Sequence, residues 1–199
     1  MNTKNELLRQ AEGLQAEALE VIEILGLRTR WEAVGETIMV GSARFGLMMS
    51  PNIDYEIYVD APDARVGFGA ISDIAAHPNV SKVEYHNFMN TSDPGLYWHL
   101  FYDAANGRQW DIDMWLVPNS HPNAGMADAL ASAMSETLTE PDRLRILEIK
   151  NNLPPDASAR GVDIYKAVIQ DGVTDVQGFL GWLRATPPPE METWRPGMA

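Results

Sequence analysis

The sequence predicts an α+β fold in which a small mixed β-sheet with flanking helices is followed by a C-terminal helical bundle. Up to residue 118, helical apolar spacing alternates with short runs rich in β-branched and aromatic residues, which are typical of strands. After Pro118 the strand-like runs stop and the apolar spacing is helical. We therefore expect an α/β domain over residues 1–118, a C-terminal helical subdomain over 119–186 and a flexible tail over 187–199.

The N-terminal part begins with a helix over residues 5–27, because its apolar side chains recur at intervals of three and four. Strands are expected over 36–40 and 53–59. A helix capped by Asp63 should run to about Ala76 and stop before a His-Pro pair. The remaining predicted strands cover residues 80–89, 96–103 and 108–117.

The last two of these strands are joined at Asn106-Gly107, a sequence that favours a two-residue hairpin loop. With these two residues at the centre of the turn, Tyr102 faces Asp111. Opposed residues of an antiparallel pair share a face of the sheet, so Asp111 and Asp113 would lie on the same face as Tyr102. A loop longer by one residue would reverse this assignment.

The C-terminal part predicts four helices, and the boundaries between them are marked by residues that break helices. Asn-Asn-Leu-Pro-Pro and Asp-Gly sequences separate them, and three consecutive prolines begin the tail. The expected helices cover residues 124–138, 141–151, 157–170 and 173–183.

Composition narrows the possible functions. The 199 residues are 45% hydrophobic and 22% charged, which suffices for a buried core, and no apolar run approaches the ~18 residues that span a bilayer. The N-terminal residues form no apolar signal core, so a cytoplasmic location without membrane association is expected. The absence of cysteine excludes thiolate catalysis and cysteine–zinc sites.

The net charge is −13, with 15 basic residues, and polyanion binding depends on basic residues. Nucleic acid is therefore not expected as a partner.

A pair of acidic residues is the clearest candidate for a metal site. Asp54 and Glu56 lie two residues apart on a predicted strand and so point to the same face. Adjacent carboxylates repel each other, and a divalent cation relieves the repulsion; oxygen ligands suit Mg²⁺ or Mn²⁺. Asp111 or Asp113 could add a third ligand. Alternating acids can also mark a solvated sheet face, but the apolar and aromatic residues around these acids favour a site.

Small residues at the end of the first predicted strand suggest a phosphate-binding turn. Gly41 lets the backbone approach a phosphate closely, and Ser42 adds a hydroxyl donor. Arg44 could reach the same phosphates or could equally be a solvated loop residue. A P-loop is excluded, because Leu47-Met48 occupies the positions that require lysine and serine or threonine.

Together these elements resemble the signature of the polymerase-β-like nucleotidyltransferase superfamily. That signature is a hydrophobic residue with Gly-Ser, then nine to thirteen residues, then two acids that alternate with hydrophobic residues. Here Val40-Gly41-Ser42 is followed after eleven residues by Asp54-Tyr55-Glu56-Ile57. Residues 107–112 resemble the later strand that carries the third acid. Small antibiotic-modifying members of the superfamily also pair such a domain with a C-terminal helical one.

The resemblance implies a role for each matching residue. Gly41 and Ser42 would hold the phosphates of a nucleotide. Asp54 and Glu56 would bind two metal ions, and Asp111 would bind the catalytic metal and help to deprotonate an acceptor hydroxyl. Residues 1–118 would then form a nucleotidyltransferase-like domain.

The implied activity is metal-dependent transfer of a nucleoside monophosphate from a nucleoside triphosphate to a hydroxyl of a small molecule. Mg²⁺ or Mn²⁺ would be the cofactor, and Asp113 is the second choice for the third ligand. Lys150 and Lys166 could reach a triphosphate, although helix-surface lysines are expected at both positions. Two alternatives stay open: a catalytically inactive binding or regulatory module of the same fold, and a structural domain with acids on a wet face.

Overall fold

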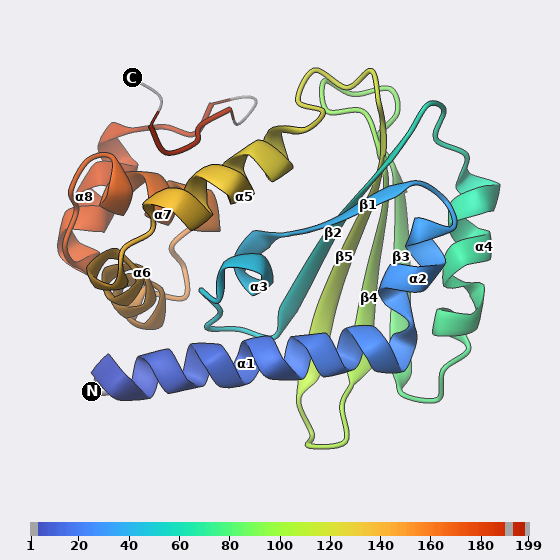
Figure 1. Cartoon of the computed structure of the whole chain (residues 1–199), viewed down its shortest axis with the longest axis horizontal. Coiled ribbons are helices and arrows are strands. Elements are labelled where there is room, and N and C mark those ends of the chain that lie inside the picture. Colours follow the sequence, from blue (N-terminus) through green and yellow to red (C-terminus); the bar gives the residue numbers. More distant parts are fainter. Residues whose placement is uncertain (1–3, 190–192, 198–199) are drawn as a thin grey trace.

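The computed structural model describes residues 4–189 and 193–197, and it has the α+β architecture expected from the sequence (Figure 1). A five-stranded sheet stands between two groups of helices. Helices α5 to α8 gather at one end of the molecule, and α2 and α4 lie at the other (Figure 1). The prediction of a mixed sheet with flanking helices is confirmed.

The strands agree closely with the predicted ranges. They are β1 (Glu36–Val40), β2 (Asn52–Val59), β3 (Val80–Asn87), β4 (Leu96–Asp103) and β5 (Gln109–Pro118). The helices are α1 (Lys4–Leu25), α2 (Leu27–Glu32), α3 (Gly41–Phe45), α4 (Ala64–Ala75), α5 (Met126–Thr137), α6 (Glu140–Asn152), α7 (Gly161–Ile169) and α8 (Val176–Ala185).

Two short helices were not expected. The predicted first helix ends earlier because Gly26 adopts a left-handed conformation, with φ of 59°, and α2 begins after it. The turn after β1 closes into α3, which begins at Gly41. This turn brings the chain from the edge strand back to β2.

The sheet order is β1-β2-β5-β4-β3. Strand β2 runs parallel to β5, whereas the other neighbouring pairs are antiparallel. Segments that are far apart in the sequence therefore lie side by side at the centre of the sheet. In this register Asp54 is paired with Asp113, and Asn52 is paired with Asp111.

The predicted register of the β4–β5 hairpin is wrong by one residue. The Ala104 amide donates to the Arg108 carbonyl at 2.8 Å, so three residues rather than two form the loop between them. Gly107 has a φ of 80°, as is usual for the last residue of a three-residue hairpin loop. Tyr102 consequently faces Trp110, and both side chains are buried in the core.

The longer loop moves the acidic residues of β5 to a different set of neighbours. Asp111 faces Phe101, and Asp113 faces His99. Because side chains alternate along a strand, the acids lie on the sheet face opposite to the buried Tyr102. They share that face with half-buried aromatic residues.

Two hydrophobic cores stabilise the fold. The first lies between the sheet, the C-terminal half of α1, α2 and α4, and contains the fully buried Trp31, Trp98 and Trp110. The second lies among α6, α7 and α8 and includes Leu7 from the N-terminal half of α1. Helix α1 contributes to both, and it extends along most of the molecule (Figure 1).

Part of the predicted tail packs on the helices. The Trp194 side chain is buried in the second core, and its Nε1 donates to Gln170 Oε1 at 2.6 Å. Residues 190–192 and 198–199 of the tail lie outside the described residues. In the described part of the chain, no helix combines the length and apolar character needed to cross a membrane.

Candidate active site

One face of the two central parallel strands carries a group of acidic side chains. Along β2, Ile53, Tyr55 and Ile57 point into the first core, so Asp54 and Glu56 point to the opposite face. The parallel register places Asp113 beside Asp54. Asp113, rather than Asp111, is therefore the β5 carboxylate next to the predicted metal-binding pair.

Asp54 lies where a negative charge is poorly compensated. Burial, the neighbouring charge of Asp113 and, more weakly, Glu56 raise the pKa of Asp54 to about 7. The charge of Lys150 acts in the opposite direction but does not offset the other effects. A bound cation would stabilise the charged form of this carboxylate.

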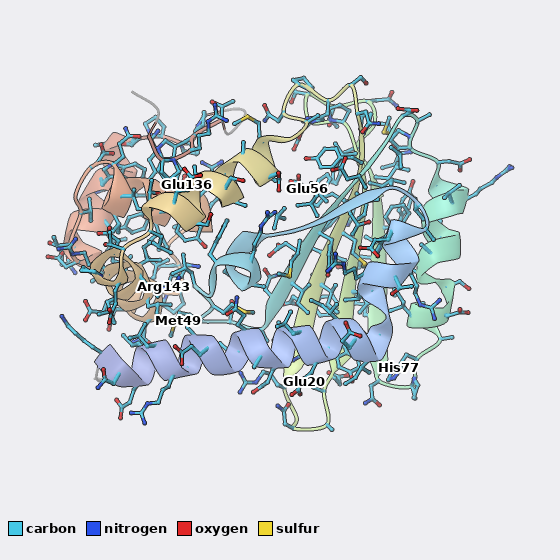
Figure 2. The ribbon with its side chains drawn as sticks, viewed as in Figure 1. Glu20, Met49, Glu56, His77, Glu136 and Arg143 are labelled. Carbon is cyan, nitrogen blue, oxygen red and sulfur yellow. The ribbon has the colours of Figure 1, made fainter. Side chains whose placement is uncertain are left out.

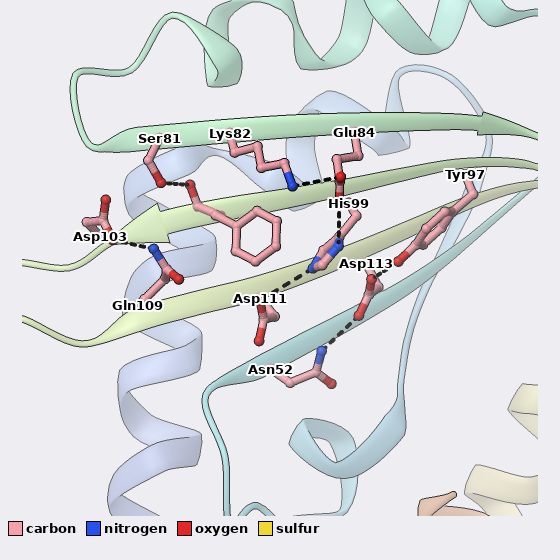
Figure 3. Close-up of polar contacts among 11 residues, drawn as sticks. Asn52, Ser81, Lys82, Glu84, Tyr97, His99, Asp103, Gln109, Asp111 and Asp113 are labelled. Carbon is pink, nitrogen blue, oxygen red and sulfur yellow. Dashed lines mark hydrogen bonds and ion pairs between the residues drawn. The ribbon is translucent and has the colours of Figure 1, made fainter. Parts of the chain in front are cut away.

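Asp113 is held in place by two hydrogen-bond donors from neighbouring strands (Figure 3). The Tyr97 hydroxyl of β4 donates to Asp113 Oδ1. Asn52 Nδ2 of β2 donates to Asp113 Oδ2 at 2.9 Å. Each oxygen of the carboxylate thus has its own donor, which fixes the side chain beside Asp54.

Glu56 faces a cavity of about 440 Å³ lined by residues of the sheet, α5 and the segment before α7. Gly41, Tyr58 and Trp115 contribute to the lining, and Figure 2 shows Glu56 between the sheet and α5. Burial raises the pKa of Glu56, and a hydrogen bond from the Tyr58 hydroxyl partly counteracts this effect. The candidate site is therefore open to a ligand on the side of Glu56.

Asp111 belongs to a different group of side chains. His99 Nε2 lies 3.4 Å from Asp111 Oδ1, and His99 Nδ1 lies 3.5 Å from Glu84 Oε2 (Figure 3). The Asp111 side chain is 47% exposed. It lies two residue pairs away from the Asp54–Asp113 pair along the sheet.

Gly41 is required by the close approach of two chain segments. It has a φ of 68°, and a Cβ at this position would lie 2.2 Å from Asp54 Oδ2. A side chain of any size would collide with the carboxylate. The strand-to-helix turn at Gly41 and Ser42 thus places bare backbone directly against the acidic group.

Arg44 ties α3 to neighbouring elements instead of lining the Glu56 cavity. Its NH1 donates to the Met39 carbonyl at 3.2 Å, and its NH2 pairs with Asp128 of α5 at 2.9 Å. The guanidinium would have to leave Asp128 to reach a phosphate near Gly41.

Lys150 is half-buried and hydrogen-bonded within the fold, in contrast to the surface lysine expected at this position. Its Nζ donates to the Leu47 carbonyl at 2.8 Å and to the Tyr165 hydroxyl at 3.0 Å. Burial lowers the pKa of Lys150 to about 8, although the charge of Asp54 acts to raise it. The sequence held a signal for this burial, because Lys150 follows the buried Ile146 and Leu147 by four and three residues on one helix face.

The donor chemistry of the acidic group suits Mg²⁺ or Mn²⁺. Asp54, Glu56 and Asp113 offer carboxylate oxygens, and burial raises the pKa values of Asp54 and Glu56. As the side chains stand, no three His, Asp or Glu residues of the described ranges form a metal-binding cluster. Asp113 and Glu56 accept hydrogen bonds from tyrosines instead.

Comparisons with known proteins find relatives by structure and not by sequence. No protein family model matches the chain, and no curated protein matches it. A Cid1 poly(U) polymerase with bound MgATP superposes with a TM-score of 0.54 at 14% identity, covering 83% of this chain and 55% of that chain. A structure of the GLD-2/RNP-8 complex matches with a TM-score of 0.54 at 16% identity, covering 87% of this chain and 68% of that chain.

These likenesses confirm the predicted resemblance at the level of the fold, because the chain shares the fold of Cid1 and of the GLD-2/RNP-8 structure. The chain spans about half of the length of the Cid1 structures that it matches. A further Cid1 structure, with a TM-score of 0.52 at 14% identity, covers 82% of this chain and 52% of that chain.

The expectation that nucleic acid is not a partner is corrected by these comparisons. Cid1 is described as having RNA terminal uridylyl transferase activity. The expectation relied on the net charge of −13, which averages over the whole surface. An enzyme that acts on the end of a strand needs a local binding site, so net charge does not decide the matter.

Proposed function

We propose that the chain is a metal-dependent nucleotidyltransferase that moves a nucleoside monophosphate from a nucleoside triphosphate to a hydroxyl group. The observation that carries this proposal is the pairing of Asp54 with Asp113 on adjacent parallel strands, directly against the Gly41 turn. The fold shared with Cid1 and GLD-2 supports it.

Asp54, Glu56 and Asp113 would hold Mg²⁺ or Mn²⁺ in this proposal, with Asp113 in place of Asp111 as the third carboxylate. The register favours Asp113, since Asp111 is paired with Asn52. Bound metal would supply positive charge that offsets the triphosphate and lowers the pKa of the acceptor hydroxyl.

The residues of the chain would position the reactants. The Gly41–Ser42 backbone would contact the phosphates, because no side chain at Gly41 stands between the backbone and the acidic group. Lys150 is the cation whose charge acts on Asp54, and it would contribute a positive charge toward a triphosphate.

Asp113, fixed by Tyr97 and Asn52, would orient the acceptor hydroxyl and accept its proton. The acceptor oxygen then bonds to the α-phosphorus, the bond between the α-phosphorus and the bridging oxygen breaks, and pyrophosphate leaves. Tyr97 and Asn52 would thus assist deprotonation of the acceptor hydroxyl by holding Asp113 in position.

The acceptor should be sought first among RNA 3′ ends. Cid1 is described as an RNA terminal uridylyl transferase, and the same hydroxyl chemistry serves a small-molecule alcohol. A panel of acceptors should therefore contain single-stranded RNA and small hydroxyl compounds, each with the four nucleoside triphosphates.

The test is pyrophosphate release with Mg²⁺ and this panel. The wild-type protein should release pyrophosphate with at least one acceptor, and Asp54→Asn and Asp113→Asn should abolish release. Asp111→Asn removes the same charge from a nearby position of β5, where the side chain is 47% exposed, and should retain most activity. Activity lost in Asp111→Asn and kept in Asp113→Asn would reverse the assignment of the third carboxylate.

A binding module without turnover is the second candidate. It is favoured by the hydrogen bonds that Glu56 and Asp113 accept from Tyr58 and Tyr97, because these bonds satisfy the carboxylates without a metal. The module would bind nucleoside triphosphate and release no pyrophosphate with any acceptor. Calorimetric titration of each triphosphate, run beside the release assay, distinguishes the two candidates.

A further inference from the structure

The sheet face that carries the candidate site continues past the acidic residues into a row of aromatic rings. Tyr97, His99 and Phe101 alternate along β4, Trp115 lies on β5, and Phe88 follows β3. These five residues are called the aromatic face below. All five side chains are half-buried, so the rings keep part of their surface in contact with solvent.

The rings of the aromatic face form a continuous track. Ring centroids are separated by 4.3 Å between Phe101 and His99, 6.2 Å between His99 and Tyr97, and 4.7 Å between Tyr97 and Trp115. Trp115 and Phe88 are stacked at 5.5 Å with an interplanar angle of 23°. The track therefore runs from the far end of β4 to the cavity that Trp115 lines.

The aromatic face is distinct from the core of the same strands. The alternating residues Trp98, Leu100 and Tyr102 of β4 point the other way and are buried against the helices. The rings of the aromatic face are not needed to fill that core. A contiguous, partly exposed aromatic surface on one side of a sheet indicates a binding surface.

The track meets the candidate site at two residues. Trp115 lines the cavity that Glu56 faces, and Tyr97 donates to Asp113 (Figure 3). A ligand lying along the rings would consequently lie beside the carboxylate that is proposed to receive the acceptor proton.

Acidic side chains predominate on this face: Glu84, Asp111 and Asp113 lie beside the rings, and Lys82 is the basic residue among them. Lys82 Nζ pairs with Glu84 at 2.7 Å and lies 5.2 Å from the centroid of the Phe101 ring. His99 lies between Glu84 and Asp111. Such a surface suits the planar faces of bases better than it suits a row of phosphates.

We propose that the aromatic face binds the single-stranded 3′ segment of a nucleic-acid acceptor, with its bases stacked on the rings and its terminal hydroxyl beside Asp113. The inference rests on the proposed function for the placement of the hydroxyl, whereas the stacking surface is independent of turnover. Exposed aromatic residues on a sheet bind single-stranded bases in other folds. Stacking also reconciles a net charge of −13 with a nucleic-acid ligand, because it depends little on neutralising phosphates.

The test is direct binding without chemistry. Fluorescence anisotropy should be measured with a labelled twelve-nucleotide single-stranded RNA, and with DNA of the same sequence, in EDTA and without nucleoside triphosphate. Phe101→Ala and Phe88→Ala should each weaken binding by ~5-fold or more, as expected for the loss of one stacking ring. Phe101→Leu keeps apolar volume without a ring and should bind as weakly as Phe101→Ala, which separates stacking from a packing defect.

Phe68→Ala provides the matched control. Phe68 is 45% exposed but lies on α4, where it packs on Trp98 at the opposite face of the sheet. This variant should bind like the wild type. Tight binding of RNA and DNA alike would identify the bases as the recognised groups, and preference for RNA would add contacts to the ribose; both support the aromatic face.

Three results would overturn the inference. The first is an absence of binding in the wild type, and the second is equal binding in the Phe101 and Phe88 variants. The third is binding that disappears at moderate salt and in Lys82→Ala while the ring variants are unaffected, since this would indicate contacts to phosphates alone. The proposed function is tested separately: pyrophosphate release to a small hydroxyl compound with no oligonucleotide binding would retain it and remove the inference.

Discussion

Replacing Asp54 by asparagine should stabilise the protein when no metal is present. Burial and the charge of Asp113 raise the pKa of Asp54 from 3.8 to about 7. Each pH unit corresponds to ~1.4 kcal/mol, so keeping this carboxylate charged in the folded protein costs at most ~4 kcal/mol. Asparagine preserves the shape of the side chain and removes the charge.

The sign of the pH dependence follows from proton binding. Between pH 3.8 and about 7 the folded protein holds the Asp54 proton and the unfolded chain has released it, so the contribution of Asp54 to stability falls as pH rises. The penalty is about 1.5 kcal/mol at pH 5 and is complete, at ~4 kcal/mol, near pH 8. Lys150 loses a nearby opposite charge in the variant, which makes this figure an upper limit.

Urea unfolding in EDTA at several pH values measures the effect. The free energy of unfolding of Asp54→Asn should exceed that of the wild type by ~2–3 kcal/mol more at pH 8 than at pH 5. Asp111→Asn is the control, because Asp111 is an acid of the same face with an exposed side chain. The reasoning is refuted if the wild type and Asp54→Asn lose stability in parallel between these pH values.

Three further substitutions test individual contacts. Gly41→Ala should lower the free energy of unfolding by at least ~1–2 kcal/mol and abolish transfer, because φ is 68° and the new Cβ would lie 2.2 Å from a carboxylate oxygen. Gly69 lies in open space on α4, so Gly69→Ala should instead raise the free energy of unfolding by ~0.5–1 kcal/mol in the same urea titration. Tyr97→Phe keeps the ring but removes the donor to Asp113, so the rate of pyrophosphate release should fall ~10–100-fold with an unchanged urea midpoint. Lys150→Met removes the positive charge that acts on Asp54, so KM for the triphosphate should rise ~10-fold or more in steady-state assays.

Two matched variants serve as controls for Tyr97→Phe and Lys150→Met. Tyr102→Phe alters a buried tyrosine on the other face of β4 and should leave the transfer rate unchanged. Lys166→Met alters a lysine of α7 and should leave KM unchanged. If Tyr102→Phe slowed transfer as much as Tyr97→Phe, or Lys166→Met raised KM as much as Lys150→Met, the assay would report general destabilisation and not the loss of one contact.

Local patterns were enough to locate the strands, and the alternation along β2 correctly placed Asp54 and Glu56 on one face. Pairing between distant segments was not predictable to the same degree. The hairpin register depended on whether the loop contained two or three residues, and the left-handed conformation of Gly107 ends a three-residue loop. That single residue decides whether Asp111 lies with core side chains or with the aromatic face.

The candidate site shows the same division between local and long-range information. The Gly41 turn and the alternating acids are local and could be recognised in the sequence. The neighbours of Asp113, by contrast, come from strands whose relative register has no sequence signal, and neither Asn52 nor Tyr97 was identified as its partner. The exposure of Lys150 was predicted wrongly for a different reason. A lysine on a helix is usually exposed, and that expectation was preferred to the helical spacing, which places Lys150 on the same face as the buried Ile146 and Leu147.

Helix α1 limits how the molecule can move. Leu7 and Ala11 belong to the second core, whereas Leu14 and Ala18 belong to the first, so one continuous helix is clamped at both ends. Opening the two groups of elements like a hinge would require α1 to bend or to leave one of its cores, and packed interiors resist such deformation. We therefore expect substrates to enter and leave through rearrangement of side chains and loops around a nearly rigid frame.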